Sequence, residues 1–309
     1  MPGIGVITNP RSKANKLAPH NMYSLGYMLG TRGSAEATRS LDDLYRVAEE
    51  FKAAGIDILG INGGDGTVHV TLTAFIKVYG DAKLPKIALL RGGTLNTIAR
   101  SLGIKGSPQN LLYNVADKYH NGETFVLDNR AVLQVNDRYG FMFGTGIAYN
   151  FMDAYYATGN PSPLNGAKVL ARLVGSALVG GPFSKKMGRR VPMRVTSEGV
   201  TWARQDFLTV VCGAMADIGL GFRPWYRWNE VPGKFAAVGI HCSPARLALE
   251  LYKVFRARAI RRDKAIDEVS GHLRLEADEP IGYIMDGDKY LEDRELNIRT
   301  GPRLDFILR

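Results

Sequence analysis

The feature that most constrains this chain is a glycine-rich turn between two segments of different periodicity. The apolar run Ile56–Ile61 predicts a buried strand, and Val68–Tyr79 has the apolar spacing of a helix. Between them, Asn62–Thr67 contains three glycines and one carboxylate, Asp65. Glycines let the backbone approach a ligand closely, and a helix start offers free N–H groups to an anion, so the turn predicts a phosphate site. The alternative is an ordinary strand-to-helix turn with Asp65 as the helix N-cap.

A second turn of the same kind follows the next apolar run. Lys86–Leu90 predicts another strand, which is followed by Gly92 and Gly93 and then by a helical segment. Thr94 and Asn96, within this turn, can donate hydrogen bonds. Parallel strands would place both glycine turns at the same edge of one sheet, where they could hold one ligand from two sides.

The rest of residues 1–122 is typical of an α/β domain. Pro2–Thr8 predicts a first buried strand, and Asn9–Asn15 predicts a polar loop at its end. Ser40–Ala54 predicts a helix with a capping box at its start, and Pro108–Tyr119 predicts a further helix. We therefore expect a first domain over residues 1–122 that contains both glycine turns.

From about Glu123 the pattern changes to short apolar runs separated by turn residues, which predicts a β-rich second domain over residues 123–309. The expected strands are Phe125–Leu127, Ala131–Val135, Gly140–Phe143, Val191–Thr196, Phe207–Cys212, Phe235–Ile240, His272–Leu275, Ile281–Met285, Glu295–Ile298 and Leu304–Leu308. Turns are expected at Asp128-Asn129 and at Asn136–Arg138, and the last strand could return to the first domain. Helical insertions are expected at Pro163–Leu178 and Pro244–Arg262, and loops at Pro182–Arg190 and Phe222–Lys234.

The chain is basic, with a net charge of +10 and a pI near 9.5, which favours binding to polyanions. Pro244–Arg262 sets leucines among arginines, so it could lie at a membrane surface or pack on the core with a basic outer face. Trp225 and Trp228 stand beside arginines and suit a lipid–water interface, a stacking site, or a plug at the end of a sheet.

Several classes of protein are disfavoured by composition. Neither the longest apolar runs nor the N-terminus reads as a membrane span or signal peptide, so a cytoplasmic protein is expected. Two cysteines, Cys212 and Cys242, are too few and too far apart for a disulfide framework or a zinc motif. The basic clusters lack a recognisable nucleic-acid recognition module, so no nucleic-acid partner is expected.

One more motif lies near the C-terminus. Met285–Asp288 places the carboxylates of Asp286 and Asp288 at the tip of an expected hairpin. Asp-Gly is also the ordinary two-residue hairpin signal, so the motif alone does not indicate catalysis.

Taken together, these segments resemble the diacylglycerol kinase catalytic-domain family, which includes bacterial lipid kinases, sphingosine kinases and ceramide kinases. They are similar to the family's Asn-Pro-x-Ser, its glycine-aspartate nucleotide motif, its Gly-Thr-x-Asn-Asp-x-Ala-Arg and its Asp-Gly-Glu. The matching residues, in chain order, are Asn9-Pro10-Arg11-Ser12, Gly63-Gly64-Asp65-Gly66-Thr67, Gly93-Thr94-Leu95-Asn96-Thr97-Ile98-Ala99-Arg100 and Asp286-Gly287-Asp288. The similarity spans nearly the whole chain.

The resemblance implies an NAD kinase-like nucleotide-binding α/β domain followed by a β-sandwich domain with helical insertions. It also implies that ATP phosphates are held by Asn9, Ser12, Gly63, Gly64, Asp65, Gly66, Thr67, Gly92, Gly93, Thr94 and Asn96. Asp65 would be a catalytic residue that organises ATP-bound Mg²⁺ or the acceptor hydroxyl. Asp288, at the family's glutamate position, would be the catalytic general base.

The chain also departs from the family pattern. Thr97 stands where many members have aspartate, Lys13 replaces a frequent glycine, and His69 is followed by valine where glutamate is frequent. The family's Asp-Asp-Gly metal loop is represented only by Asn229-Glu230, so no structural metal is assigned there. Asp288 is one methylene shorter than glutamate, so as a base it needs the acceptor about 1 Å closer.

The sequence is thus interpreted as an ATP-dependent lipid kinase that transfers the γ-phosphate to a hydroxyl of diacylglycerol or a sphingoid-like lipid. Such a transfer needs held phosphates, Mg²⁺ and a carboxylate base, and the chain offers residues for each. The expected partners are the lipid substrate, an anionic membrane surface bound peripherally from the cytoplasm, and a second copy in a homodimer. The alternatives are a soluble NAD kinase-type metabolite kinase and an inactive nucleotide- or lipid-binding protein.

Overall fold

The structure is a computed structural model that describes residues 3–308 except 18, 160–161 and 293. The chain divides into two compact units. Unit 1 comprises residues 1–132, 138–140 and 302–309, and unit 2 comprises residues 133–137 and 141–301. The C-terminal strand therefore contributes its two halves to different units.

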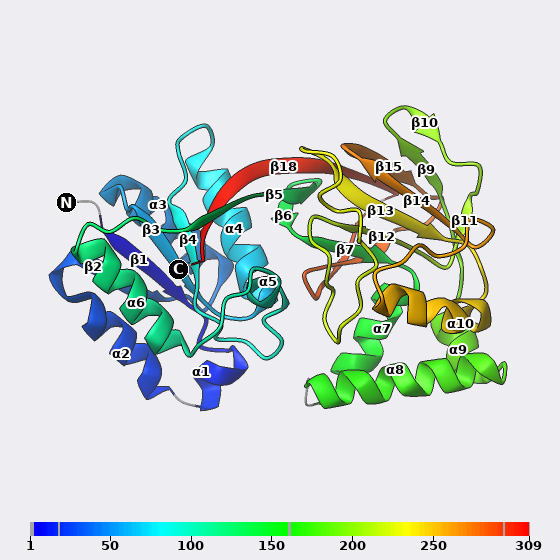
Figure 1. The fold of residues 1–309 in the computed structure, drawn as a ribbon, viewed down its shortest axis with the longest axis horizontal. Coiled ribbons are helices and arrows are strands. Elements are labelled where there is room, and N and C mark those ends of the chain that lie inside the picture. The colour runs from blue at the N-terminus through cyan, green and yellow to red at the C-terminus, as the bar shows by residue number, and fades with distance from the viewer. Residues whose placement is uncertain (1–2, 18, 160–161, 293, 309) are drawn as a thin grey trace. The chain divides into compact units, whose positions relative to one another are not determined.

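Unit 1 is an α/β unit built on parallel strands (Figure 1). Four strands pair in the order β4-β3-β1-β2, and β4 also pairs in parallel with the end of β18 at Phe306. The bounds of the strands are β1 Ile4–Thr8, β2 Gly33–Ala37, β3 Ile58–Asn62, β4 Lys86–Leu89 and β18 Glu295–Ile307. Of these, β1 and β3 are buried throughout, as expected for a parallel sheet covered on both faces.

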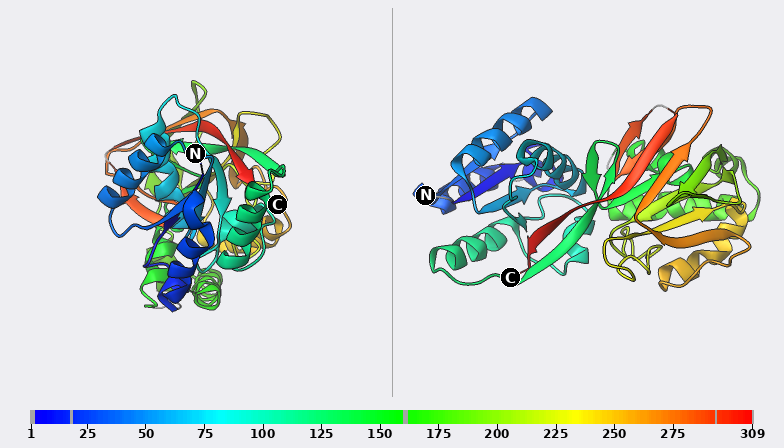
Figure 2. Two further views of the ribbon diagram at one scale, coloured as in Figure 1. Left: turned by 90° about the vertical axis from the view of Figure 1, so that its left-hand side faces the viewer. Right: turned by 90° about the horizontal axis from the view of Figure 1, so that it is seen from above.

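Helices cover this sheet. In Figure 2, α2 and α6 lie together, and their apolar residues share one core cluster with Ile4, Val6 and Ile58 of the strands. The opposite face packs on α3, since a side chain at Gly5 would overlap the ring of Phe51. The helices of unit 1 are α1 Lys13–Leu17, α2 His20–Leu29, α3 Leu41–Ala54, α4 Asp65–Tyr79, α5 Thr97–Ser101 and α6 Pro108–His120, with a short 3₁₀ turn, η1, at Gly30–Arg32.

Unit 2 is built on antiparallel strands. A six-stranded sheet has the order β14-β13-β12-β7-β16-β17, and β10-β9-β15 continue onto the first half of β18. The bounds are β7 Met142–Thr145, β8 Val191–Pro192, β9 Arg194–Ser197, β10 Val200–Thr201, β11 Asp206–Phe207, β12 Thr209–Gly213, β13 Phe235–Ile240, β14 Ala265–Ser270, β15 His272–Glu276, β16 Gly282–Met285 and β17 Asp288–Leu291. Strand β5, Leu127–Val135, runs from unit 1 into unit 2 and pairs with β18 and with β6, Arg138–Gly140.

Among the described residues of unit 2, the helices are α7 Ile147–Tyr156, α8 Pro163–Leu178, α9 Pro182–Met187 and α10 Pro244–Phe255. The mixed α/β first part and the antiparallel second part confirm the predicted fold class. The predicted bounds of α8 are confirmed, as are the capping box of Ser40 and Asp43 at the start of α3 and the left-handed Gly55 that ends it.

Other predicted elements were wrong in their limits. Lys13 already begins α1, so the polar loop after β1 is shorter than predicted, and Pro2 lies outside the described residues. Helix α4 begins at Asp65 rather than Val68, and its N-cap is Gly64, so Asp65 does not cap its own helix. The residues expected to form a loop at Pro182–Arg190 instead contain α9.

The predicted turn at Asp128-Asn129 does not occur, because β5 runs through it. Asn129 donates to Asp305 (2.7 Å) and accepts from Arg303 (2.5 Å), so its polar groups are satisfied across the strand pair. The two predicted C-terminal strands are likewise one, β18. The second predicted helical insertion ends at Phe255, since Ala257 has a φ of 52°.

Two predicted side-chain environments were settled by packing. Trp225 is 2% exposed, and a Cβ added to Gly213 would lie 2.2 Å from its ring, so this tryptophan fills the core beside β12. The plug interpretation therefore holds for Trp225. Cys212 and Cys242 are buried free thiols, as predicted. Within the described residues, no helix is long and apolar enough to cross a membrane.

Candidate active site

Three loops of unit 1 meet at the carboxyl ends of neighbouring parallel strands. The loop after β1 contains Asn9 and Ser12, the loop after β3 contains Gly63 and Gly64, and the loop after β4 contains Gly92–Asn96. Backbone hydrogen bonds join them: the N–H of Asn9 donates to the carbonyl of Asn62 (3.1 Å), and the N–H of Ala14 donates to that of Gly92 (3.3 Å). This is the edge at which α/β sheets bind ligands.

Thr67 connects the first loop to the second. Its hydroxyl accepts a hydrogen bond from the side-chain amide of Asn9 (2.9 Å) and lies 3.4 Å from the hydroxyl of Ser12. Thr67 is buried in the first turn of α4, so the two loops are held in fixed register at the start of this helix. These three predicted site residues are therefore in direct contact.

Two asparagines that no sequence motif indicated join the loops after β1 and β3. The side-chain amide of Asn15 donates to the carbonyl of Asn9 (2.8 Å) and to that of Asn62 (3.2 Å), and its oxygen accepts from the side chain of Asn62 (3.2 Å). Both side chains are buried. Paired buried asparagines separated by 47 residues leave no local pattern, so their role could be found only from the fold.

The two glycine turns pack backbone against backbone. A Cβ added to Gly93 would lie 2.2 Å from the Cα of Gly64, and one added to Gly92 would lie 2.3 Å from Oδ1 of Asn62. A Cβ at Gly63 would lie 2.3 Å from that of Thr67. The close approach of the two turns thus requires glycine at these positions. As at the start of any helix, the first N–H groups of α4 have no intrahelical acceptors.

The side chain of Asn96 forms hydrogen bonds within its own turn. Its side-chain oxygen accepts from the N–H of Gly93 (3.0 Å), and its amide donates to the carbonyls of Gly93 (3.1 Å) and Arg91 (3.2 Å). The side chain therefore closes the second glycine turn on itself. Asn96 also has a φ of 48°, in the left-handed region that asparagine tolerates.

Asp65 joins the two glycine turns. Its carboxylate accepts from the backbone N–H groups of Thr97 (2.9 Å) and Ile98 (3.0 Å), and so caps the start of α5. The side chain of Thr97 also hydrogen-bonds to it. Burial raises the pKa of the Asp65 carboxyl, and these donations oppose the rise. A threonine at the family's aspartate position thus supplies a donor to Asp65 instead of a second negative charge.

His69, the other departure in this region, lies inside unit 1. Its Nδ1 donates to the carbonyl of Tyr139 (2.8 Å), and the ring is 1% exposed. Burial lowers the pKa of His69 to about 4, so the ring is neutral at pH 7. His69 therefore packs the base of α4 instead of supplying charge.

In unit 2, the motif Met285–Asp288 forms the tip of the hairpin between β16 and β17, as predicted. Asp286 is buried, with a φ of 49°, and its carboxylate accepts from the backbone N–H groups of Phe141 (3.0 Å) and Met142 (2.8 Å). Asp286 therefore anchors the hairpin to the start of β7. This contact spans 145 residues of sequence and was not predicted.

Asp288, the predicted base, has a different environment from Asp286. Burial raises its pKa from an ordinary value near 3.8 to about 6, and no other cause contributes. Helix α7, which the sequence did not predict, supports the hairpin: Tyr156 donates to the carbonyl of Gly287 (3.1 Å), and Lys289 forms an ion pair with Asp153. Asp288 is thus a carboxyl poised to titrate near neutral pH on a well-anchored turn.

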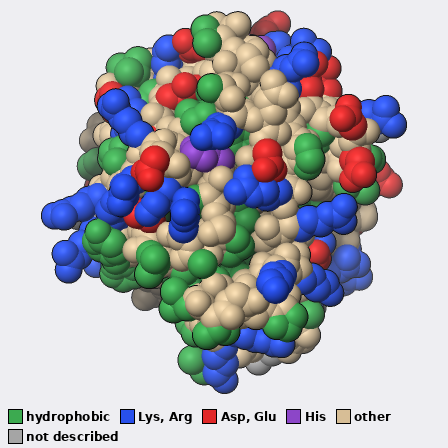
Figure 3. Space-filling model, turned by 90° about the vertical axis from the view of Figure 1, so that its right-hand side faces the viewer, with side chains coloured by type: hydrophobic (Ala, Val, Ile, Leu, Met, Phe, Trp, Pro, Cys, Tyr) green, Lys and Arg blue, Asp and Glu red, His purple; other side chains and the backbone are tan. Residues whose placement is uncertain are grey.

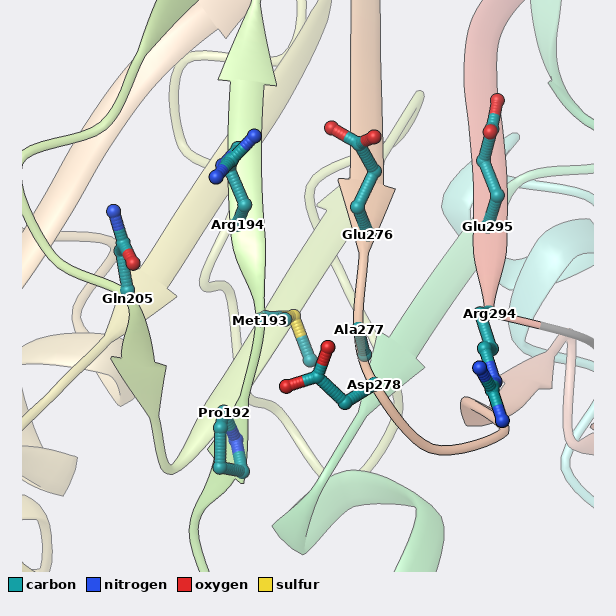
Figure 4. A pocket seen from close by; sticks show the side chains of 9 residues that line it. All are labelled: Pro192, Met193, Arg194, Gln205, Glu276, Ala277, Asp278, Arg294 and Glu295. Atoms are coloured by element: carbon teal, nitrogen blue, oxygen red, sulfur yellow. The ribbon is translucent and has the colours of Figure 1, made fainter.

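A pocket of about 420 Å³ also lies in unit 2, beside the start of β9, the end of β15 and the start of β18 (Figure 4). It contains none of the predicted site residues, and its lining consists of Pro192, Met193, Arg194, Gln205, Glu276, Ala277, Asp278, Arg294 and Glu295. Arg274 pairs with Glu276 (3.2 Å) and Glu295 (2.8 Å), so two of its carboxylates already have partners.

His, Cys, Asp and Glu side chains are the protein ligands that could hold a metal ion. Within the described residues, no group of three or more His, Cys, Asp or Glu side chains could hold an ion. Asp65 alone therefore fits a metal that arrives with a nucleotide and keeps phosphate and water ligands, since Mg²⁺ needs only one or two protein carboxylates. A resident metal held by protein ligands does not fit these residues.

We expect Gly93→Ala to lower the free energy of unfolding by about 1–3 kcal/mol, because its Cβ would overlap the backbone of Gly64 and no rotamer change could relieve the contact. Urea denaturation measures the change. Gly175→Ala in α8 is the matched control: nothing lies within 4 Å of its added Cβ, so its stability should stay the same or rise. Wild-type stability in Gly93→Ala would contradict the close packing of the two turns.

The glycine turns at the carboxyl edge of the parallel sheet in unit 1, and the antiparallel strands of unit 2, agree with comparisons to known proteins. Residues 3–124 match the model of the diacylglycerol kinase catalytic domain. These residues, less than half of the chain, are similar to the diacylglycerol kinase catalytic domain family.

Individual proteins are similar to this chain either over a short segment or over its whole length at low sequence identity. The chain is 39% identical over 62 residues to "Probable lipid kinase YegS" from Escherichia coli O127:H6 and from Shigella flexneri, a match that covers 20% of this chain and 20% of each relative. Two crystal structures from Bacillus anthracis str. Sterne, one titled as of "a diacylglycerol kinases" and one as of "a putative diacylglycerol kinase", each match 99% of this chain and 97% of their own, with TM-scores of 0.67 and 0.73 at 14% and 15% identity. These structures share the fold of the whole chain.

Proposed function

We propose that the protein is an ATP-dependent lipid kinase that transfers the γ-phosphate to a hydroxyl of diacylglycerol or a sphingoid-like lipid. The observation that carries the proposal is the backbone contact between Gly64 and Gly93 beside the start of α4. This contact leaves no room for side chains and presents free N–H groups and the positive end of a helix of 15 residues to an anion.

In this proposal, unit 1 binds ATP through its phosphates. The glycine turns and the N–H groups of α4 face the phosphates, while Thr67, Asn96 and Asp65 keep the three loops in place. Mg²⁺ bound with ATP would neutralise the charge that develops on the transferred phosphoryl group, with Asp65 as the available carboxylate. Most of the acceleration then comes from holding the phosphates in position.

Asp288 is the proposed general base. A carboxylate with a pKa of about 6 is ionised at pH 7 and is a stronger base than an ordinary aspartate. It would take the proton of the acceptor hydroxyl as that oxygen attacks the γ-phosphorus. Its neighbour Asp286 is assigned no such role, because its side chain is buried and anchors the hairpin to the start of β7.

The lipid acceptor implies a cytoplasmic protein that associates with the surface of an anionic membrane. The net charge of +10 supports such an association, since basic residues near an anionic surface each contribute about 1 kcal/mol. A homodimer remains part of the proposal and can be checked by sedimentation.

The test is incubation of the purified protein with labelled ATP and Mg²⁺, separately with diacylglycerol, sphingosine, ceramide, monoacylglycerol and NAD. Label in one or more lipids is the expected result, and Asp65→Asn should abolish it. Label in NAD alone would replace the proposal with a metabolite kinase. No labelled product from a protein that is folded by circular dichroism would contradict it and favour an inactive binding protein.

A further inference from the structure

Two packed helices of unit 2, α8 and α10, expose large apolar side chains to solvent. On α8 these are Leu164 (65% exposed) and, directly after its end, Val179 (82%), and on α10 they are Leu249 (62%) and Phe255 (55%). Monomeric proteins tolerate single exposed residues of this kind, but a group on neighbouring helices marks an interaction surface.

Each helix also has a separate buried face, and of the four exposed residues Phe255 additionally places its ring edge-on against Phe222 (5.6 Å between centroids). Leu173 of α8 and Val254 of α10 lie in the same core cluster. On α10, the exposed Arg246, Leu249 and Arg256 follow at helical spacing and so share the outer face. The exposed faces of α8 and α10 therefore lie opposite the residues with which these two packed helices contact their shared core cluster.

The surface is also strongly positive. Between Asp153 and Glu198 the chain has no Asp or Glu but has seven Lys or Arg residues. Among them, Lys168, Lys185 and Lys186 are exposed and pair with no carboxylate in the described part of the chain.

The acid within α10 does not offset this charge. Glu250 is buried and pairs with Lys253 (2.7 Å) and Lys264 (2.6 Å), so no negative charge is left on the outer face of the helix. In the lower half of Figure 3, Lys and Arg side chains accordingly lie beside hydrophobic ones, with few acidic side chains between them.

We propose that this α8–α10 face, defined by Leu164, Lys168, Val179, Arg246, Leu249 and Phe255, is the surface by which the protein docks onto an anionic lipid bilayer. Exposed aliphatic and aromatic side chains would enter the headgroup region, and the cations beside them would bind anionic lipid. The proposal deepens the proposed function, because a lipid kinase must reach a substrate that resides in a bilayer.

The combination of exposed apolar and basic side chains decides which kind of partner fits this face. Charge complementarity favours an anionic partner, since Lys168, Arg246 and Arg256 are exposed and pair with no carboxylate in the described part of the chain. A nucleic acid would satisfy the cations but would leave Val179 and Leu249 in water, whereas a bilayer satisfies both.

The experiment is co-sedimentation of the full chain with phosphatidylcholine vesicles, with and without phosphatidylglycerol, at low and high salt. The test variants are the pairs Arg246→Glu/Arg256→Glu and Val179→Glu/Leu249→Glu. The matched controls in unit 1 are Lys83→Glu and Tyr113→Glu, which alter equally exposed residues. Activity toward detergent-dispersed diacylglycerol is measured in parallel for every variant.

We expect the wild type to bind anionic vesicles at low salt and to lose that preference at high salt. Each test pair should reduce binding by about tenfold or more, since one basic residue contributes about fivefold, while the controls stay near wild type. Vesicle binding that the test pairs leave unchanged, equal binding to neutral vesicles, or capture by duplex DNA in place of vesicles would overturn the proposal. Inactivity toward all dispersed lipids with vesicle binding intact would instead overturn the proposed function alone.

Discussion

Replacing Asp288 with asparagine is expected to lower kcat for lipid phosphorylation by about 10²–10⁴-fold, the usual contribution of a general base. Stability should not fall. Burial of Asp288 raises its pKa to about 6, so the folded protein disfavours the charged form, and an uncharged amide at this position removes that penalty. At pH 7 to 8 the melting temperature of Asp288→Asn should therefore equal or exceed that of the wild type.

The same pKa predicts the pH dependence. A base must be ionised to act, so kcat/KM of the wild type should fall about tenfold per pH unit below about pH 6. Stability depends on pH in the opposite direction to activity. The folded-state pKa of Asp288 lies above its unfolded value near 3.8, so folding favours the protonated carboxyl. The wild type therefore loses stability relative to Asp288→Asn as the pH rises through about 6. Melting curves of both proteins across this range measure the difference.

Asp286→Asn is the matched control, two residues away on the same turn. An asparagine with its oxygen at the Oδ1 position can still accept from Phe141 and Met142, but its NH₂ group would then replace Oδ2 3.0 Å from the N–H of Phe141 and place two donors against each other. We expect a loss of stability of about 1–3 kcal/mol. Wild-type kcat in Asp288→Asn would rule out Asp288 as the base, whatever the outcome for Asp286→Asn.

Elements set by local pattern were predictable from sequence. The strand–glycine–helix units around Gly63 and Gly93 combine period, turn chemistry and helix start within a few residues, so their positions at the edge of the sheet followed directly. Elements that form only through tertiary pairing were not. Strand β2 consists of Gly-Ser-Ala-Glu-Ala, which has low strand propensity and is stabilised by pairing with β1.

Among the helices that were not predicted, α2 and α7 were missed for related reasons. Helix α2 has no side-chain cap, and α7 is rich in aromatic residues and begins after Gly146 within a region of short strands. The site residues likewise divide into features that a local motif predicts and features that only the fold determines. The glycines and Asp65 could be read from the motif, but the direction of their hydrogen bonds could not, since Asn96 turns inward and Asp65 reaches a helix more than thirty residues away.

Asp65→Asn is the second change with a large expected effect, because the structure assigns the carboxylate two N–H groups of α5. An asparagine side chain accepts with one oxygen and turns an NH₂ group toward the other donor. We expect the free energy of unfolding to fall by about 1–3 kcal/mol and transfer of phosphate to be lost, since the second glycine turn would no longer be held against the first.

The decisive measurement is urea denaturation of Asp65→Asn and wild type without ATP and without divalent metal. A residue that served only as a metal ligand would leave stability unchanged or higher under these conditions, because a ligand contributes only when the metal is bound. A residue that caps α5 lowers stability in both the presence and absence of Mg²⁺. Thr97→Val, which removes one side-chain donor to Asp65 and keeps its shape, should give a smaller loss in the same direction. Equal stability of Asp65→Asn and wild type without metal would show that the glycine turns are aligned by other contacts and that Asp65 acts on the ligand alone.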